Sequence, residues 1–173
     1  MHLLFVCTAN ICRSPMAERM ALALASSPAV RTSSAGTHAL IGQPIHPEAA
    51  RVLHDRRATT TAFAARRFTP ALAGEADLIL TMTRQHRDDV LEQVPGALRR
   101  TFCLTEAAAL IRRFDPHALT ELPSLRPHLD TNEVLDIADP YGHGSAVYRR
   151  VGAQIADLLA PIVDFCQGIS GSD

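Results

Sequence analysis

Cys7 stands six residues before Arg13 near the start of the chain, in the segment Cys7-Thr8-Ala9-Asn10-Ile11-Cys12-Arg13-Ser14-Pro15. A cysteine thiolate is a nucleophile, and a guanidinium can hold two oxygens of a tetrahedral anion in a planar fork. The spacing alone is weak evidence, because such a pair also arises by chance in a chain with four cysteines and many arginines. The surroundings of the pair therefore decide whether it does chemistry.

The segment lies between an apolar run and the start of a helix. Residues 2–7 are typical of a buried strand, and Pro15 suits an early helical position, where its missing N–H costs nothing. Backbone N–H groups of such a loop converge on an anion, and the helix N-terminus adds free N–H groups and the positive end of its dipole. This position favours an oxyanion site over a plain buried cysteine and a solvated arginine.

Each residue type in the loop has a role in such a site. The positive field favours the thiolate of Cys7, and the hydroxyl of Ser14 can donate a hydrogen bond to it. Asn10 can brace the loop through its side chain and tolerates a left-handed backbone. We expect the anion to be bound by the residues that follow Cys7, namely Thr8, Ala9, Asn10, Ile11, Cys12, Arg13 and Ser14.

The rest of the chain alternates predicted strands and helices. We expect strands at residues 2–7, 30–35, 77–82 and 100–104, and helices at residues 14–26, 47–57, 83–93, 105–114 and 145–166. This alternation predicts a single α/β domain over residues 1–173, with three layers: a four-stranded parallel sheet and helices on both of its faces. Ligands bind beyond the carboxyl ends of such strands, where the loop after residue 7 lies.

Composition excludes several classes of function. The 173 residues are 47% hydrophobic with a net charge of −1, so the basic excess of a nucleic-acid binder is missing. No stretch is long enough for a membrane span, and no signal peptide opens the chain, so we expect a cytoplasmic protein without membrane contact.

The four cysteines are spaced too irregularly for a disulfide scaffold or a zinc site, and we expect no metal and no cofactor. Cys103 and Cys166 are interpreted as buried packing residues.

Four blocks of the sequence resemble the low-molecular-weight protein tyrosine phosphatases of bacterial type, in order and over nearly the whole chain: residues 7–15, 34–37, 76–82 and 139–142. The resemblance implies a flavodoxin-like (Rossmann-like) sheet with strand order 2-1-3-4. It also implies hydrolysis of a phosphomonoester through a phosphocysteine on Cys7. Arg13 would then be the phosphate clamp and Asp139 the general acid and base.

The acid has to be chosen among three aspartates. Asp115 and Asp139 each precede a proline, and Asp136 is a third candidate. We choose Asp139 because it precedes an aromatic residue and the last helix, as in the family. Tyr141 could stack on a phenyl leaving group.

The resemblance also bears on the substrate and the partner. Leu40 falls on the opposite rim from Tyr141, where some members carry an aromatic residue. Relatives that act on phosphoarginine have a threonine at the position of Ile11, whose bulk would favour a flat phosphotyrosine ring. The expected substrate is a phosphotyrosine protein or a small aryl phosphate, with a tyrosine kinase as a possible partner.

One segment departs from the family in length, and one cysteine of the loop has two interpretations. Residues 111–138 are longer than the usual connection, and we interpret them as a loop insertion that contacts a partner or forms a lid. Cys12 lies five residues from Cys7. The resemblance makes it a reversible disulfide partner that protects Cys7, and a simple packing role is equally open.

Two other functions remain open from the sequence. A thioredoxin-coupled arsenate reductase has a similar fold and loop, but it relays a disulfide through further cysteines, whereas Cys103 and Cys166 lie far apart on a predicted strand and helix. A non-catalytic phosphate-binding or phosphopeptide-binding module would not need nucleophile, clamp and acid together. All three are present here, which favours the enzyme.

Overall fold

A computed structural model describes residues 1–130, 132 and 134–170. Its sheet has four strands, β1 (His2–Cys7), β2 (Arg31–Gly36), β3 (Leu78–Thr81) and β4 (Thr101–Cys103). All neighbouring strands are parallel, in the order β2-β1-β3-β4. The predicted strands, their direction and their order are confirmed. The order reverses between β1 and β3, so the carboxyl ends of these two strands flank the ligand-binding edge of the sheet.

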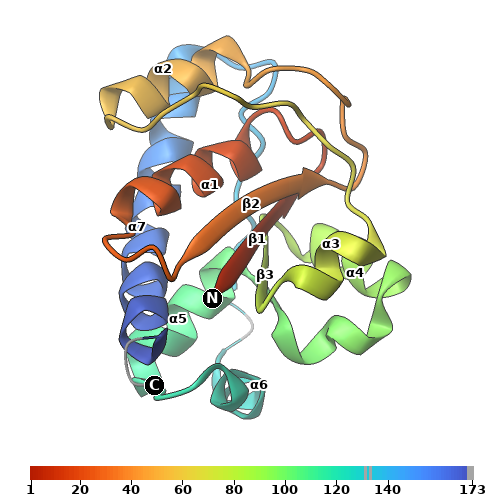
Figure 1. Ribbon diagram of the computed structural model, residues 1–173, viewed down its shortest axis with the longest axis vertical. Coiled ribbons are helices and arrows are strands. Elements are labelled where there is room, and N and C mark those ends of the chain that lie inside the picture. The colour runs from red at the N-terminus through yellow and green to blue at the C-terminus, as the bar shows by residue number, and fades with distance from the viewer. Residues whose placement is uncertain (131, 133, 171–173) are drawn as a thin grey trace.

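Helices cover both faces of the sheet, as predicted. Figure 1 shows α1, α2, α5 and α7 on one side and α3 and α4 on the other. The α-helices are α1 (Arg13–Leu24), α2 (Pro47–Asp55), α3 (Pro70–Glu75), α4 (Arg84–Gln93), α5 (Leu104–Phe114), α6 (Leu122–Leu125) and α7 (Ser145–Ser170). Short 3₁₀ helices are η1 (Pro95–Arg100), η2 (Leu119–Glu121) and η3 (Arg126–His128). Within the described residues, no helix combines the length and the apolar character needed to cross a bilayer.

The central strand β1 is buried on both faces. Leu3 and Phe5 belong to the core cluster under α1, α5 and α7, whereas Leu4 and Val6 belong to the cluster under α3 and α4. Successive side chains of a strand point to opposite faces, so a strand covered on both sides is a continuous apolar run. This burial fixes the end of β1, and with it the position of Cys7.

The predicted loop of residues 111–138 is wrong in part. Residues 111–114 form the end of α5, in agreement with the helix predicted at residues 105–114, and η2, α6 and η3 occupy much of the segment that follows. Pro123 and Pro127 each stand in the first turn of one of these short helices, where proline is well tolerated. Pro70 likewise begins α3, which the sequence did not predict. Residues 131 and 133 of the predicted insertion lie outside the described residues.

Candidate active site

The loop of residues 8–12 joins β1 to α1 and is held from outside by the segment of residues 37–46. Carbonyl oxygens of residues 7, 8, 9 and 11 accept hydrogen bonds from backbone N–H groups of that segment at 2.9–3.0 Å. The C=O of a trans peptide and the N–H of the next residue point in opposite directions. The N–H groups of residues 8, 9, 10 and 12 therefore point away from this segment, as the N–H groups of an anion-binding nest do.

Asn10 braces the loop, as the sequence suggested. It is fully buried and has a left-handed backbone with φ of 58°. Its Nδ2 donates to Oγ of Ser14 at 2.9 Å and to Oγ of Ser34 at 2.8 Å, and its Oδ1 accepts from the backbone N–H of Arg66 at 2.9 Å. The side chain thus ties the loop to α1, to β2 and to the strand-like segment beside β2.

Cys7 ends β1 with its sulfur against the first turn of α1. Its Sγ lies 2.9 Å from Oγ of Ser14, and both residues are buried. Because Asn10 donates to the Ser14 oxygen, the hydroxyl proton of Ser14 is free to point at the sulfur; the other acceptor within reach, the carbonyl of Ala35, is farther away at 3.4 Å. The arrangement suits a thiolate that accepts a hydrogen bond.

Arg13 is the first residue of α1 and is only 4% exposed. Its Nη1 donates to the carbonyl of Ile137 at 3.1 Å, and its Nη2 donates to Oδ2 of Asp139 at 2.6 Å. The predicted clamp and the predicted acid are therefore in contact. Asp136, the rejected candidate, instead accepts from the backbone N–H of Arg84 at 2.8 Å and is turned toward α4.

A hollow of about 230 Å³ lies over the loop. It is lined by Cys7, Thr8, Ala9, Ile11, Cys12, Arg13, His38, Leu40, Asp139 and Tyr141. The fold thus brings every predicted site residue to one place, with Asn10 and Ser14 bracing the hollow from behind. His38 also lines it and was not predicted.

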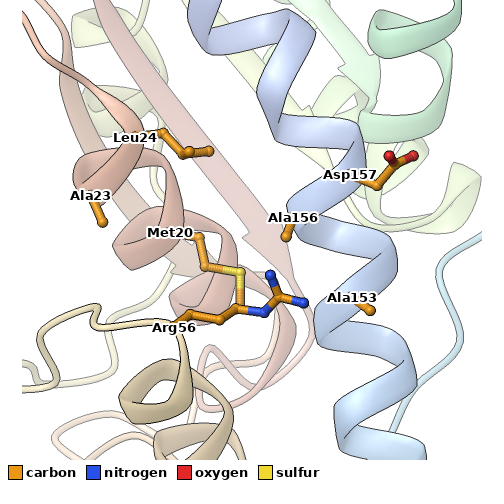
Figure 2. Close-up of a pocket in the computed structure, with 7 residues that line it drawn as sticks. All are labelled: Met20, Ala23, Leu24, Arg56, Ala153, Ala156 and Asp157. Carbon is orange, nitrogen blue, oxygen red and sulfur yellow. The ribbon is translucent and has the colours of Figure 1, made fainter.

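A second hollow, of about 460 Å³, lies between α1 and α7 (Figure 2). Its lining residues are Met20, Ala23, Leu24, Arg56, Ala153, Ala156 and Asp157. Among these side chains there is no nucleophile, and the carboxylate of Asp157 is engaged with Arg112 at 3.1 Å. The smaller hollow over the loop is therefore the candidate active site.

His86 is a site residue that the sequence analysis missed. It lies in α4, is buried and touches the loop. Its Nε2 lies 2.8 Å from Oγ1 of Thr8, and its Nδ1 lies 2.8 Å from Oγ1 of Thr83, which caps α4. Burial, and then the charge of Arg13, lower the pKa of His86 to about 4. The available signal was its position just after a buried strand, at the ligand-binding edge of the sheet.

An aromatic stack on the other side of the loop was also missed. The rings of His46 and Tyr148 are parallel with centroids 5.2 Å apart, and Tyr141 meets His46 edge-on at 5.7 Å. The hydroxyl of Tyr148 lies 3.4 Å from Sγ of Cys12. Burial raises the pKa of the Cys12 thiol to about 11, so this thiol stays protonated at neutral pH.

Comparison with known proteins identifies the family. The model of the family described as low molecular weight phosphotyrosine protein phosphatase matches residues 2–164. The chain belongs to this family. Low molecular weight protein-tyrosine phosphatase A of Mycobacterium bovis is 34% identical over 170 residues, which are 95% of this chain and 91% of that protein. The low molecular weight protein-tyrosine-phosphatase Wzb of Escherichia coli is 37% identical over 94 residues, which are 54% of this chain and 63% of that protein.

Solved structures of the family share the fold. The YwlE arginine phosphatase from Geobacillus stearothermophilus superposes with a TM-score of 0.78 at 28% identity, over 96% of this chain and 92% of that one. Membership of the low molecular weight phosphatases confirms the family that the sequence resembles, the enzyme class and the fold class.

Proposed function

We propose that this phosphatase hydrolyses aryl phosphate monoesters, phosphotyrosine in proteins above all, through a phosphocysteine on Cys7. One observation carries the proposal: Cys7, Arg13 and Asp139 line one hollow over a loop whose carbonyl groups are bonded to the segment of residues 37–46, which leaves its N–H groups on the opposite side. These are the groups that a thiol-based phosphoryl transfer requires.

In the first step the Cys7 thiolate attacks phosphorus, so that a P–S bond forms while the ester P–O bond breaks. The loop N–H groups and Arg13 hold the three equatorial oxygens, whose charge the transition state spreads. Asp139, in its protonated form, gives its proton to the leaving oxygen, and the alcohol departs neutral.

In the second step the same carboxylate acts as a base. Asp139 takes a proton from water while the water oxygen attacks phosphorus, the P–S bond breaks, and inorganic phosphate leaves. The electron pair of that bond returns to sulfur as a thiolate. The Ser14 hydroxyl, 2.9 Å from the sulfur, stabilises this leaving group.

The walls of the hollow support an aryl substrate. Leu40 is 47% exposed and Tyr141 is 59% exposed, and both line the hollow together with Ile11. Exposed apolar side chains beside a polar anion site suit a flat ring attached to a phosphate. A small aryl phosphate would bind in the same way, and a tyrosine kinase acting on the same protein is the proposed partner.

The cysteines support a reducing, cytoplasmic location and count against an arsenate reductase. Within the described residues, none of the four is joined in a disulfide. Burial raises the pKa of Cys103 to about 11 and that of Cys166 to about 12, so neither is a ready nucleophile for a disulfide relay. Arsenate-dependent oxidation of thioredoxin by this chain would support the reductase instead.

The proposal is tested by hydrolysis of p-nitrophenyl phosphate and of peptides that carry phosphotyrosine or phosphoarginine. We expect turnover of the nitrophenyl and phosphotyrosine substrates by wild type, none by Cys7→Ser, and normal turnover by the matched control Cys166→Ala. A phosphoenzyme trapped by rapid acid quench should be absent from Cys7→Ser. Turnover equal in wild type and Cys7→Ser would overturn the proposal, and preference for phosphoarginine would overturn the assigned substrate.

A further inference from the structure

His86 bridges the two strand ends that flank the active site. Thr8 is the first residue after β1, and Thr83 is the N-cap of α4, which follows β3. The imidazole, 5% exposed, lies 2.8 Å from the side-chain oxygen of each threonine. No step of the proposed mechanism uses this ring, although it touches the loop that holds the anion.

The Thr8 hydroxyl connects this ring to Arg13. Nη2 of Arg13, which donates to Asp139, also lies 3.5 Å from Oγ1 of Thr8, while Nη1 donates to the carbonyl of Ile137. Threonine is stiff at χ1, so the bond to His86 fixes the direction in which Oγ1 faces. When a phosphoryl group takes the place of the Asp139 carboxylate, the Ile137 carbonyl and the Thr8 hydroxyl are the acceptors that still orient the guanidinium.

We propose that His86 is a positioning residue, which holds the Thr8 hydroxyl and through it keeps the Arg13 guanidinium in the orientation that binds a phosphoryl group. The proposal rests on the proposed function only in assigning the anion to this loop. It adds a residue outside the loop to the machinery that recognises phosphate.

The neutral form of the ring suits this role. In either neutral tautomer one nitrogen donates and the other accepts, so the ring can bond to both hydroxyls. An imidazolium would add a second positive charge beside Arg13. Burial and Arg13 lower the pKa of His86 to about 4, against the smaller opposing effects of Asp89, Asp139 and Asp136, so the ring is neutral near pH 7.

The test is binding of inorganic phosphate, measured by isothermal titration calorimetry at pH 7. The variants are His86→Ala, His86→Gln, Thr8→Val and the double variant with His86→Ala and Thr8→Val. Gln85→Ala is the matched control, because Gln85 neighbours His86 on α4 but is exposed and bonds to Asp89 instead. KM and kcat for p-nitrophenyl phosphate are measured in parallel.

His86→Ala and Thr8→Val should each weaken phosphate binding about five- to tenfold, the effect of one lost hydrogen bond. The double variant should be no weaker than Thr8→Val, because both changes break the same chain, and His86→Gln should restore most of the affinity. In the kinetics, KM should rise more than kcat falls.

Three results would overturn the inference: wild-type affinity in His86→Ala, multiplicative losses in the double variant, or no restoration by His86→Gln. Thr8→Val removes a single hydroxyl and leaves the core intact, so wild-type phosphate affinity in this variant would also overturn the inference, even if His86→Ala fails to fold. Normal phosphate binding without turnover in wild type would refute the proposed function and leave the role of His86 to be decided by the same titrations.

Discussion

Oδ2 of Asp139 lies 2.6 Å from Nη2 of Arg13, so the proposed acid and the proposed phosphate clamp bind each other in the free protein. A phosphoryl oxygen has to take the place of this carboxylate on the guanidinium. Asp139 is about half exposed (48%), whereas Arg13 is buried, so the aspartate is the partner that can turn away. In the proposed mechanism, substrate binding releases the carboxylate to face the leaving oxygen.

Asp139→Asn should lower kcat for phenyl phosphate by about 10²- to 10⁴-fold, the usual contribution of a general acid. The loss should be smaller for p-nitrophenyl phosphate, because its leaving group needs less protonation. Inorganic phosphate should inhibit the variant at least as well as wild type, since Arg13 loses a competing carboxylate. Steady-state kinetics with both substrates check this, with Asp115→Asn, the other Asp-Pro pair, as control. A fall in kcat in Asp115→Asn but not in Asp139→Asn would assign the role of general acid to Asp115.

Ser14→Ala should remove the hydrogen bond to the Cys7 sulfur together with the one from Asn10, whose remaining bonds to Ser34 and Arg66 hold the loop in place. A hydrogen bond to a charged group contributes about 1.5–3 kcal/mol, so breakdown of the phosphocysteine should slow by roughly 10- to 100-fold. Iodoacetamide should also alkylate Cys7 more slowly, because the sulfur loses a hydrogen-bond donor that stabilises its anion. Thr105→Ala, which removes a hydroxyl bonded to the carbonyl of Leu135, is the control. Unchanged alkylation in Ser14→Ala would show that this bond does not stabilise the thiolate.

Gly36→Ala should disturb the loop from the neighbouring strand. A Cβ at Gly36 would lie 2.4 Å from the carbonyl oxygen of Thr8 and 3.0 Å from the backbone nitrogen of Asn10, so the loop backbone must move. We expect a loss of about 1–3 kcal/mol in the free energy of unfolding, together with weaker phosphate binding. Gly74→Ala is the matched control, since a Cβ there meets no atom within 4 Å. Urea unfolding checks both variants, and equal stability of the two would contradict the predicted clash.

His86 should make the fold less stable in acid. Its pKa is lowered from 6.5 to about 4 in the folded state, so the unfolded chain binds a proton first as the pH falls. The contribution of this group to the free energy of unfolding is present above pH 6.5 and is lost as the pH falls toward 4. Between pH 7 and pH 4.5 the free energy of unfolding should fall by about 2 kcal/mol because of His86. Urea unfolding at these two pH values should show a smaller loss in His86→Gln than in wild type. The control variant His54→Gln, at an exposed histidine, should lose as much stability between these pH values as wild type. A loss in His86→Gln equal to that of wild type would show that His86 does not cause the loss of stability in acid.

The proposed nucleophile and its loop were predictable because their signals are local. The apolar run that ends at Cys7, the loop and the helix that begins at Arg13 are contiguous, and a strand–loop–helix unit largely fixes its own geometry. The acid was only partly predictable. Asp139 was chosen among three aspartates by resemblance, and the contact with Arg13 joins residues 126 positions apart.

The sequence by itself determined the succession of strands and helices along the chain, the loop of residues 7–15 and the residue types able to bind phosphate. All of these depend on residues that are neighbours in the sequence. The tertiary structure alone decided which distant side chains meet that loop. His86 reaches Thr8 across 78 positions and Tyr148 reaches Cys12 across 136, because the parallel sheet places the ends of β1 and β3 side by side and α7 packs against α1. Such contacts follow from how the layers pack, which no local pattern of residues specifies.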